Sequence, residues 1–82
     1  MKKKEFENLQ EHLDGWAMDK DVDEVCEYLK GKGLEFADEG IDDGGEEDGE
    51  YIMYRVYSIG RYDVKLYYSN ADYNVSWILY RE

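Results

Sequence analysis

Residues 51–80 read YIMYRVYSIGRYDVKLYYSNADYNVSWILY, and this stretch decides the fold. It contains three runs rich in Tyr, Val, Ile and Trp, which are separated by Gly60 and by a turn-like SNAD sequence. The runs lie at about 51–59, 61–68 and 73–80. Aromatic and β-branched residues favour strands, whereas Gly, Ser, Asn and Asp favour turns. The stretch therefore predicts a three-stranded antiparallel meander.

Alternation along these strands predicts one apolar face and one wetter face. In the middle strand, the apolar face is expected to carry Tyr62, Val64, Leu66 and Tyr68. In the last strand, the alternation places on one side Val75, Trp77 and Leu79. Four tyrosines are expected on the wetter face, with Met53 beside them: Tyr51, Tyr57, Tyr67 and Tyr80.

Two short helices are expected before the meander. The first, at about 3–14, has an apolar stripe and ends at Gly15; the stripe is Phe6, Leu9 and Leu13. The second, at about 21–30, can be capped by Asp19 or Asp21, and Asp21 with Glu24 resembles a capping box. Its stripe is Val22, Val25, Cys26 and Leu29. A short strand at about 34–38 follows. The predicted fold is a single α+β domain, residues 1–82, with both helices on one face of a three- to four-stranded antiparallel sheet.

A strongly acidic segment lies between the second helix and the meander. Between Gly33 and Tyr54 there are nine carboxylates and no Lys or Arg, so this segment alone carries −9 of the total charge of −11. Residues 39–50 combine four Gly with seven carboxylates, which predicts a long acidic loop. The nine carboxylates are Glu35, Asp38, Glu39, Asp42, Asp43, Glu46, Glu47, Asp48 and Glu50.

The composition indicates where in the cell the protein is expected and which kind of molecule it is expected to bind. No apolar run approaches the roughly 20 residues needed to cross a bilayer, and the basic start of the chain lacks the apolar stretch of a signal peptide. A single cysteine fits a reducing compartment, so a cytoplasmic location is expected. Nucleic acid and anionic membranes repel an acidic protein, whereas basic protein surfaces attract it. The expected state is a monomer or a small homo-oligomer, since strand edges can pair between copies.

The sequence predicts no catalytic residue, metal site or cofactor, and hence no enzyme. His12 is expected on the surface, and Cys26, its one possible partner for a reactive site, in the core stripe. Residues 19–23 match the first half of a calcium-binding EF-hand loop. The match fails at its sixth and twelfth positions, which are Glu24 and Lys30 instead of Gly and Glu.

The acidic segment and the tyrosines together predict a protein-binding surface. Proteins that bind DNA line their grooves with Lys and Arg, and a dense set of carboxylates can occupy such a groove in place of phosphates. Charge would supply orientation and association rate, whereas affinity requires buried anchors such as Tyr, Trp and Met. The nine carboxylates and the four wetter-face tyrosines are therefore the predicted partner-binding residues.

In size, acidity, lack of an export signal and the carboxylates from Glu35 to Glu50, the chain resembles the small phage-encoded anti-CRISPR and DNA-mimic inhibitors. The resemblance implies an inhibitor in the bacterial host cytosol that binds a basic nucleic-acid-binding protein or nuclease complex and touches no nucleic acid itself. Two alternatives remain open. One is an immunity protein or antitoxin that neutralises a basic toxin nuclease. The other is a regulatory or structural protein whose acidic loop only adds solubility.

Overall fold

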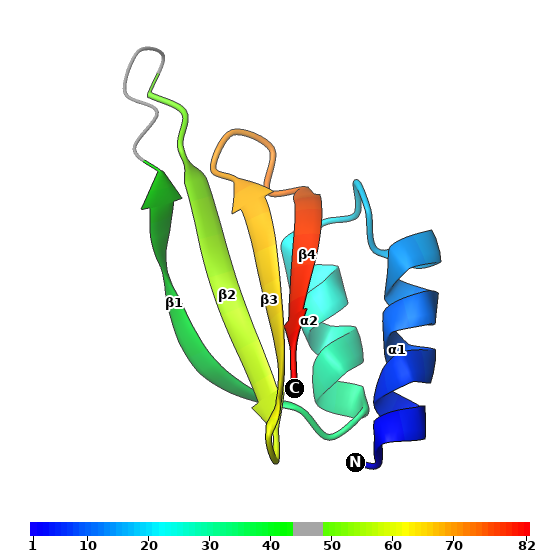
Figure 1. Ribbon diagram of the computed structural model, residues 1–82. Coiled ribbons are helices and arrows are strands. Elements are labelled where there is room, and N and C mark those ends of the chain that lie inside the picture. The colour runs from blue at the N-terminus through cyan, green and yellow to red at the C-terminus, as the bar shows by residue number, and fades with distance from the viewer. Residues whose placement is uncertain (44–48) are drawn as a thin grey trace.

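The computed structural model describes residues 1–43 and 49–82, and it contains two helices followed by four strands (Figure 1). The helices are α1 (Lys3–Trp16) and α2 (Val22–Gly31). The strands are β1 (Glu35–Asp43), β2 (Ile52–Ile59), β3 (Tyr62–Ser69) and β4 (Val75–Arg81). They form one antiparallel sheet in the order β1-β2-β3-β4, which confirms the predicted α+β class.

The core lies between the two helices and one face of the sheet, so the opposite face is left open (Figure 1). Both predicted helical stripes are buried, from Phe6 on α1 to Leu29 on α2. The predicted apolar face of β3 is also buried: Tyr62, Val64, Leu66 and Tyr68. The Phe6 ring stacks on the Tyr62 ring with centroids 4.5 Å apart, which joins α1 to the sheet.

The helix ends differ from expectation by one or two residues. Gly15 does not stop α1, which continues to Trp16 and is closed by the Ala17 N–H donating to the Leu13 carbonyl at 2.8 Å. Ala17 is fully buried, so the chain is held in helical geometry until that residue reaches the core. At α2 the N-cap is Asp21, one of the two expected candidates, and its carboxylate accepts a hydrogen bond from the Asp23 N–H at 2.8 Å.

A backbone junction ties the α1–α2 connection to the start of β4. The Asp19 N–H donates to the Val75 carbonyl, the Val75 N–H donates to the Lys20 carbonyl, and the Val22 N–H donates to the Tyr73 carbonyl. Asp19 and Tyr73 both have positive φ, 65° and 60°, a conformation that costs free energy in residues with a side chain. The junction fixes where α2 begins, and it covers the first residue of β4.

The first strand is longer than its sequence predicted. A short strand at 34–38 and a loop over 39–50 were expected, but β1 continues through Glu39 and Gly40 to Asp43 and pairs with β2 along this length. Two register shifts accommodate the unfavourable composition, one at Ala37 and one at Asp42. Strand propensity is weak in this segment, and pairing with the well-formed β2 overrides it.

The remaining strand bounds shift slightly from the expected 51–59, 61–68 and 73–80. The hairpin between β2 and β3 turns at Gly60, whose φ is 59°. Among the described residues, no helix is long and apolar enough to span a membrane.

Candidate interaction surface

The carboxylates of β1 are exposed along the outer strand of the sheet. Those with described side chains are Glu35, Asp38, Glu39 and Asp42, and Glu50 is exposed just before β2. The ion pairs found in the described part of the chain join other residues, namely Lys20 with Glu24, Lys30 with Glu27, and Arg55 with Asp23. Among the described residues, the β1 carboxylates form no ion pair, and they present their negative charge to solvent.

For four of the predicted acidic residues, the structure does not describe where the side chain lies. Glu46, Glu47 and Asp48 lie outside the described residues, and Asp43 is placed only by its backbone pairing with Ile52. The β1 carboxylates also divide between the two faces of the sheet. Asp38 pairs with Val56 on the open face, whereas Glu39 pairs with Arg55 on the helix-covered face. The acidic surface is thus an edge with charge on both sides.

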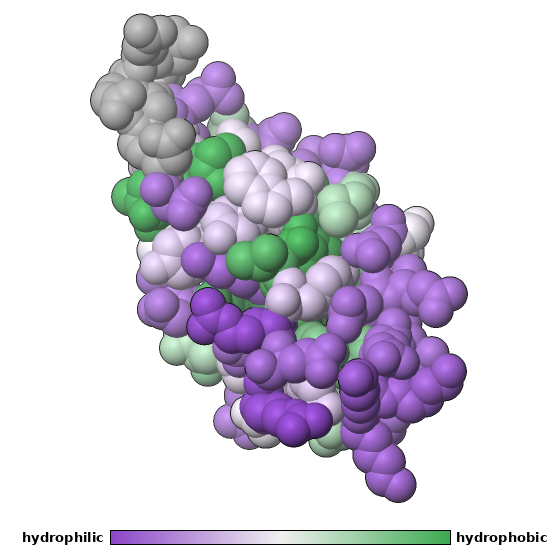
Figure 2. All heavy atoms as spheres, in the orientation of Figure 1, coloured by the Kyte–Doolittle hydropathy of each residue, from purple (hydrophilic) through white to green (hydrophobic). Residues whose placement is uncertain are grey.

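The open face carries a row of aromatic rings that crosses the sheet. Tyr54 on β2, Tyr67 on β3 and Trp77 on β4 occupy successive paired positions. Tyr67 and Trp77 stack with ring centroids 4.5 Å apart, and Tyr54 lies 6.4 Å from Tyr67. Figure 2 shows pale and green spheres gathered on this side over the central part of the molecule, with purple hydrophilic residues around them.

Lys65 and Gly40 lie against the rings of this row. The Lys65 ammonium lies 4.3 Å from the Tyr54 ring centroid and 5.0 Å from that of Tyr67, a cation–π arrangement with both rings. A hydrogen bond with Tyr67 raises the pKa of Lys65 above its ordinary value. At the other end, a Cβ on Gly40 would lie 2.7 Å from the Tyr54 hydroxyl oxygen, so glycine gives this ring room to lie across β1.

A shallow groove runs beside the row, between β1 and β4. Its walls include the apolar Val56 and Leu79 and the charged Asp38, Lys65 and Arg81. Asp63 also lines the groove and accepts a hydrogen bond from the Ser58 hydroxyl at 2.6 Å. The open face therefore combines exposed apolar surface with groups of both charges, and β1 adds the acidic edge next to it.

Two of the four predicted surface tyrosines lie on the covered side of the sheet. Tyr57 belongs to the buried core, and the half-buried Tyr80 hydroxyl donates to the Asp14 carboxylate on α1 at 2.9 Å. Met53, which was expected beside them, also packs against the core. Tyr67 is on the open face as expected but is only 7% exposed. Tyr51 is half-buried just before β2.

A β-bulge in β4 explains why the faces of this strand were wrongly predicted. Tyr68 pairs with Val75 but its neighbour Tyr67 pairs with Trp77, so Ser76 is an extra residue between these two pairs. Val75 remains in the core, whereas Trp77 and Leu79 move to the open face, where they are 44% and 52% exposed. Simple alternation had placed all three on one side. The two most exposed apolar side chains of the open face were therefore missed.

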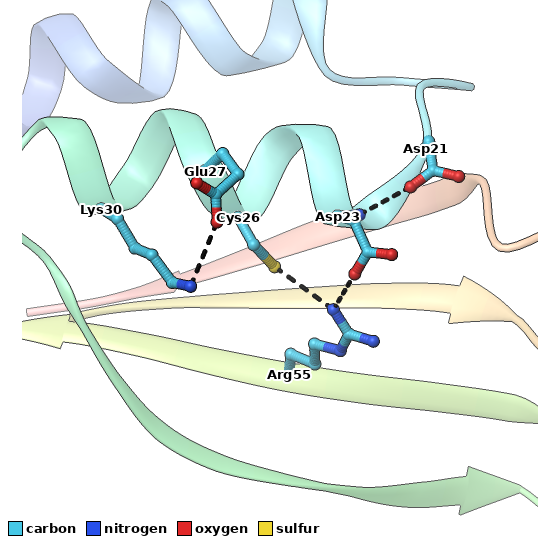
Figure 3. A network of polar contacts seen from close by, with 6 residues as sticks. All are labelled: Asp21, Asp23, Cys26, Glu27, Lys30 and Arg55. Carbon is cyan, nitrogen blue, oxygen red and sulfur yellow. Dashed lines mark hydrogen bonds and ion pairs between the residues drawn. The ribbon is translucent and has the colours of Figure 1, made fainter.

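Arg55 is the charged side chain that joins β2 to α2 (Figure 3). Its guanidinium donates to the Asp23 carboxylate at 2.6 Å and to the Cys26 sulfur at 3.8 Å, and it lies 5.2 Å from the Tyr68 ring centroid. Burial alone would lower the pKa of Arg55. The hydrogen bonds raise this pKa by a larger amount, so its net shift is upward. The buried Nε atom has no hydrogen-bond partner within the described part of the chain. Arg55 is thus permanently charged, and its anionic partner is the Asp23 carboxylate.

Replacing Asp23 with alanine is expected to destabilise the protein by about 1–2 kcal/mol, because Arg55 would keep its partly buried charge and lose its anionic partner. The expected loss of stability is no larger because solvent screens the Asp23 side chain, which is 68% exposed. Urea unfolding measures the change. Glu24→Ala is the matched control in the same helical turn: its 3.9 Å pair with Lys20 is exposed, and its loss is expected to cost under about 0.5 kcal/mol. Equal costs for the two variants would contradict this role for Arg55.

The other candidate groups form no reactive constellation. His12 is exposed and stacks on Trp16 and Tyr28, with ring centroids 5.3 and 4.9 Å away. Cys26 is 3% exposed within the core. Asp21 and Asp23, from the partial EF-hand match, serve as the cap of α2 and the partner of Arg55. Within residues 1–43 and 49–82, no group of three or more potential metal ligands converges.

The surface with the most distinctive chemistry is therefore the exposed acidic edge of β1 together with the aromatic open face. Comparison with known proteins finds no family model that matches the chain, and no curated protein or solved structure that is significantly similar to it.

Proposed function

We propose that this chain is an acidic inhibitor that binds a basic, nucleic-acid-handling protein, such as a CRISPR effector or another host-defence nuclease. The observation that carries the proposal is the edge strand β1, whose described carboxylates are exposed and free of ion pairs. The sequence has no Lys or Arg between Gly33 and Tyr54 to offset them. A groove lined with Lys and Arg would gain electrostatic free energy by enclosing this edge.

The spacing of the β1 carboxylates supports this proposal. A strand rises roughly 3.3 Å per residue, and phosphates along one DNA strand advance about 3.4 Å per nucleotide. From Glu35 to Asp43, β1 places five carboxylate residues along one edge. This corresponds to about one negative charge per 6 Å, roughly half the linear charge density of a single DNA strand. Cations arranged along a nucleic-acid backbone would therefore meet about one carboxylate in place of every two phosphates.

The open face supplies the apolar contacts that charge alone does not provide. Trp77 and Leu79 are exposed, and Trp77 is held in place by stacking on Tyr67. Rigid aromatic side chains are common anchors of protein interfaces because they bury a large area with little loss of conformational entropy. We place the anchors of the proposed interface here and at Tyr54, beside Asp38. Tyr57 and Tyr80 are less suited to this role because they pack against the helices.

Two other functions use the same features. An immunity protein or antitoxin against a basic toxin nuclease would need the same acidic edge, and only the partner would differ. A purely structural role for the acids is favoured by the position of β1 as an edge strand with two bulges. Charges and bulges both prevent an edge from pairing with other chains. In that case, the carboxylates would protect the monomer and bind no partner.

The decisive variant reverses three described β1 carboxylates: Asp38→Lys, Glu39→Lys and Asp42→Lys. With a basic partner captured from bacterial lysate at low salt, we expect affinity to fall about 100-fold or more, because three attractions become repulsions. Isothermal titration calorimetry at about 50 and 300 mM salt would measure the affinity of each protein for this partner. Wild-type affinity should decrease with salt, and duplex DNA should compete for the same partner.

The matched control changes charge by the same amount elsewhere: Glu7→Lys, Glu11→Lys and Glu82→Lys, all at exposed positions away from β1. This variant is expected to retain most of the affinity, because net charge is altered equally but the edge is intact. Equal losses in the two variants would mean that only overall charge matters. Full binding and inhibition by the β1 variant would exclude phosphate mimicry by this strand and favour the protective role.

A further inference from the structure

The two outer edges of the sheet are chemically opposite. On β1 five acidic residues and two bulges oppose pairing with another chain. On β4 the run Tyr73–Tyr80 contains no charged residue. An exposed, uncharged edge strand rich in apolar residues is a template for further strand pairing. The protein thus blocks one edge and leaves the other open.

The open part of the β4 edge is well defined. The junction with the α1–α2 connection occupies Val75, whose N–H and carbonyl are bonded to Lys20 and Asp19. For Ser76–Arg81, the backbone hydrogen bonds among the described residues are those with β3. Alternate residues of this six-residue segment therefore direct their backbone donors and acceptors away from β3 at this edge. Ile78 is the centre of the uncharged part, 76–80.

We propose that this edge binds a second copy of the chain, with β4 pairing antiparallel to β4 about a two-fold axis at Ile78. In this register Trp77 of one copy lies directly opposite Leu79 of the other, and the reverse holds across the axis. Both side chains are exposed on the open face, at 44% and 52%. Cross-strand neighbours on one face are close enough to bury the sides that they turn toward each other, so each copy partly covers these side chains of the other and adds no layer over the open face.

The charge distribution favours this arrangement over other self-associations. Each chain carries −11, mostly between Gly33 and Tyr54, so any contact that brought the two β1 strands together would be strongly repulsive. Pairing through β4 produces one eight-stranded sheet with the two β1 strands at its opposite ends. With strands about 4.8 Å apart, the β1 strands would be separated by roughly 34 Å, several times the screening length at physiological salt. Both acidic edges would also remain free.

Sedimentation equilibrium of the full chain from about 10 µM to 1 mM tests the proposal. We expect a monomer–dimer equilibrium that high salt leaves unchanged or strengthens, in contrast to binding of a basic partner, which salt weakens. Leu79→Lys should raise the dimer dissociation constant at least about 30-fold, since the substituted residue occurs twice in the interface. Ile41→Lys is the matched control: Ile41 is 58% exposed on the opposite edge strand, and the dissociation constant should change less than about threefold.

Hydrogen exchange of the unmodified protein gives a second test that does not depend on the folding of a variant. Amides in 76–81 should exchange more slowly as protein concentration rises, whereas those in 35–43 should not change. A chain that stays monomeric at 1 mM, a dimer insensitive to Leu79→Lys, or concentration-dependent protection in β1 instead of β4 would each overturn the proposal. Because these experiments involve no partner protein, their failure leaves the proposed inhibitor function untouched.

Discussion

Replacing Phe6 with alanine is expected to reduce the free energy of unfolding by about 3–5 kcal/mol, the usual cost of deleting a fully buried aromatic ring. Phe6 is completely buried, stacks on Tyr62 at 4.5 Å and meets the Tyr80 ring edge-on at 6.1 Å. A chain of this size has about 4–12 kcal/mol in total. The variant should therefore be close to its unfolding threshold, with a Tm lower by roughly 12–40 °C.

Phe36→Ala is the control, because Phe36 has the same side chain but is 52% exposed on β1. Its ring makes one edge contact with Tyr57, at 5.8 Å, and its loss is expected to cost less than about 1 kcal/mol. Thermal unfolding followed by circular dichroism distinguishes the two variants. A Phe6→Ala protein as stable as Phe36→Ala would mean that α1 is not anchored to the sheet through this ring.

Alkaline solution is expected to destabilise the protein between about pH 10 and 12, because two tyrosines resist ionisation in the folded state. Burial and a hydrogen bond with the Cys26 thiol raise the pKa of Tyr57 to about 12. Burial and the hydrogen bond to Asp14 raise the pKa of Tyr80 as well. An unfolded tyrosine titrates near pH 10. Above that pH the unfolded chain loses these protons first, so the equilibrium shifts toward it.

The contribution of Tyr57 is thus fully present below pH 10 and is lost as pH rises through about 12. It is on the order of 2 kcal/mol, and urea unfolding at half-unit steps from pH 9 to 12 measures it. In Tyr57→Phe, which has no hydroxyl to ionise, stability should fall less over the same range. Parallel pH profiles for the two proteins would show that Tyr57 ionises equally in both states and would contradict the prediction.

The central part of the fold could be predicted from sequence because its patterns are regular. Phe6, Leu9 and Leu13 recur at helical spacing, and Tyr62, Val64, Leu66 and Tyr68 alternate without interruption on β3. All are buried in the structure. In these elements local propensity and tertiary packing favour the same conformation, which is the condition under which a sequence reveals its structure.

Prediction failed where a single residue changes the phase of a pattern or where packing overrides composition. The bulge at Ser76 reverses the faces of β4 after Val75, and Tyr57 was assigned to the wetter face but belongs to the buried core. β2 has polar and apolar residues on both sides, so its alternation does not reveal which side is covered. β1 contains Gly and Asp, which favour turns, yet it pairs with β2 through Asp43.

The candidate surface was therefore predicted only in part. The carboxylates Asp38, Glu39 and Asp42 lie on the surface, where an acidic segment was expected. The aromatic row was found only in the structure, since Tyr54, Lys65 and Trp77 come from three strands and meet only when these strands are in register.

The small contribution of β1 to the core has a consequence for how this protein can evolve. No side chain described on β1 is buried, and the core is built by the helices with β2, β3 and β4. Substitutions at exposed positions usually change stability by less than about 0.5 kcal/mol. The acidic strand can thus accumulate changes in charge and spacing while the rest of the chain keeps the fold. Descendants of this sequence are free to vary β1 far faster than the residues of the core.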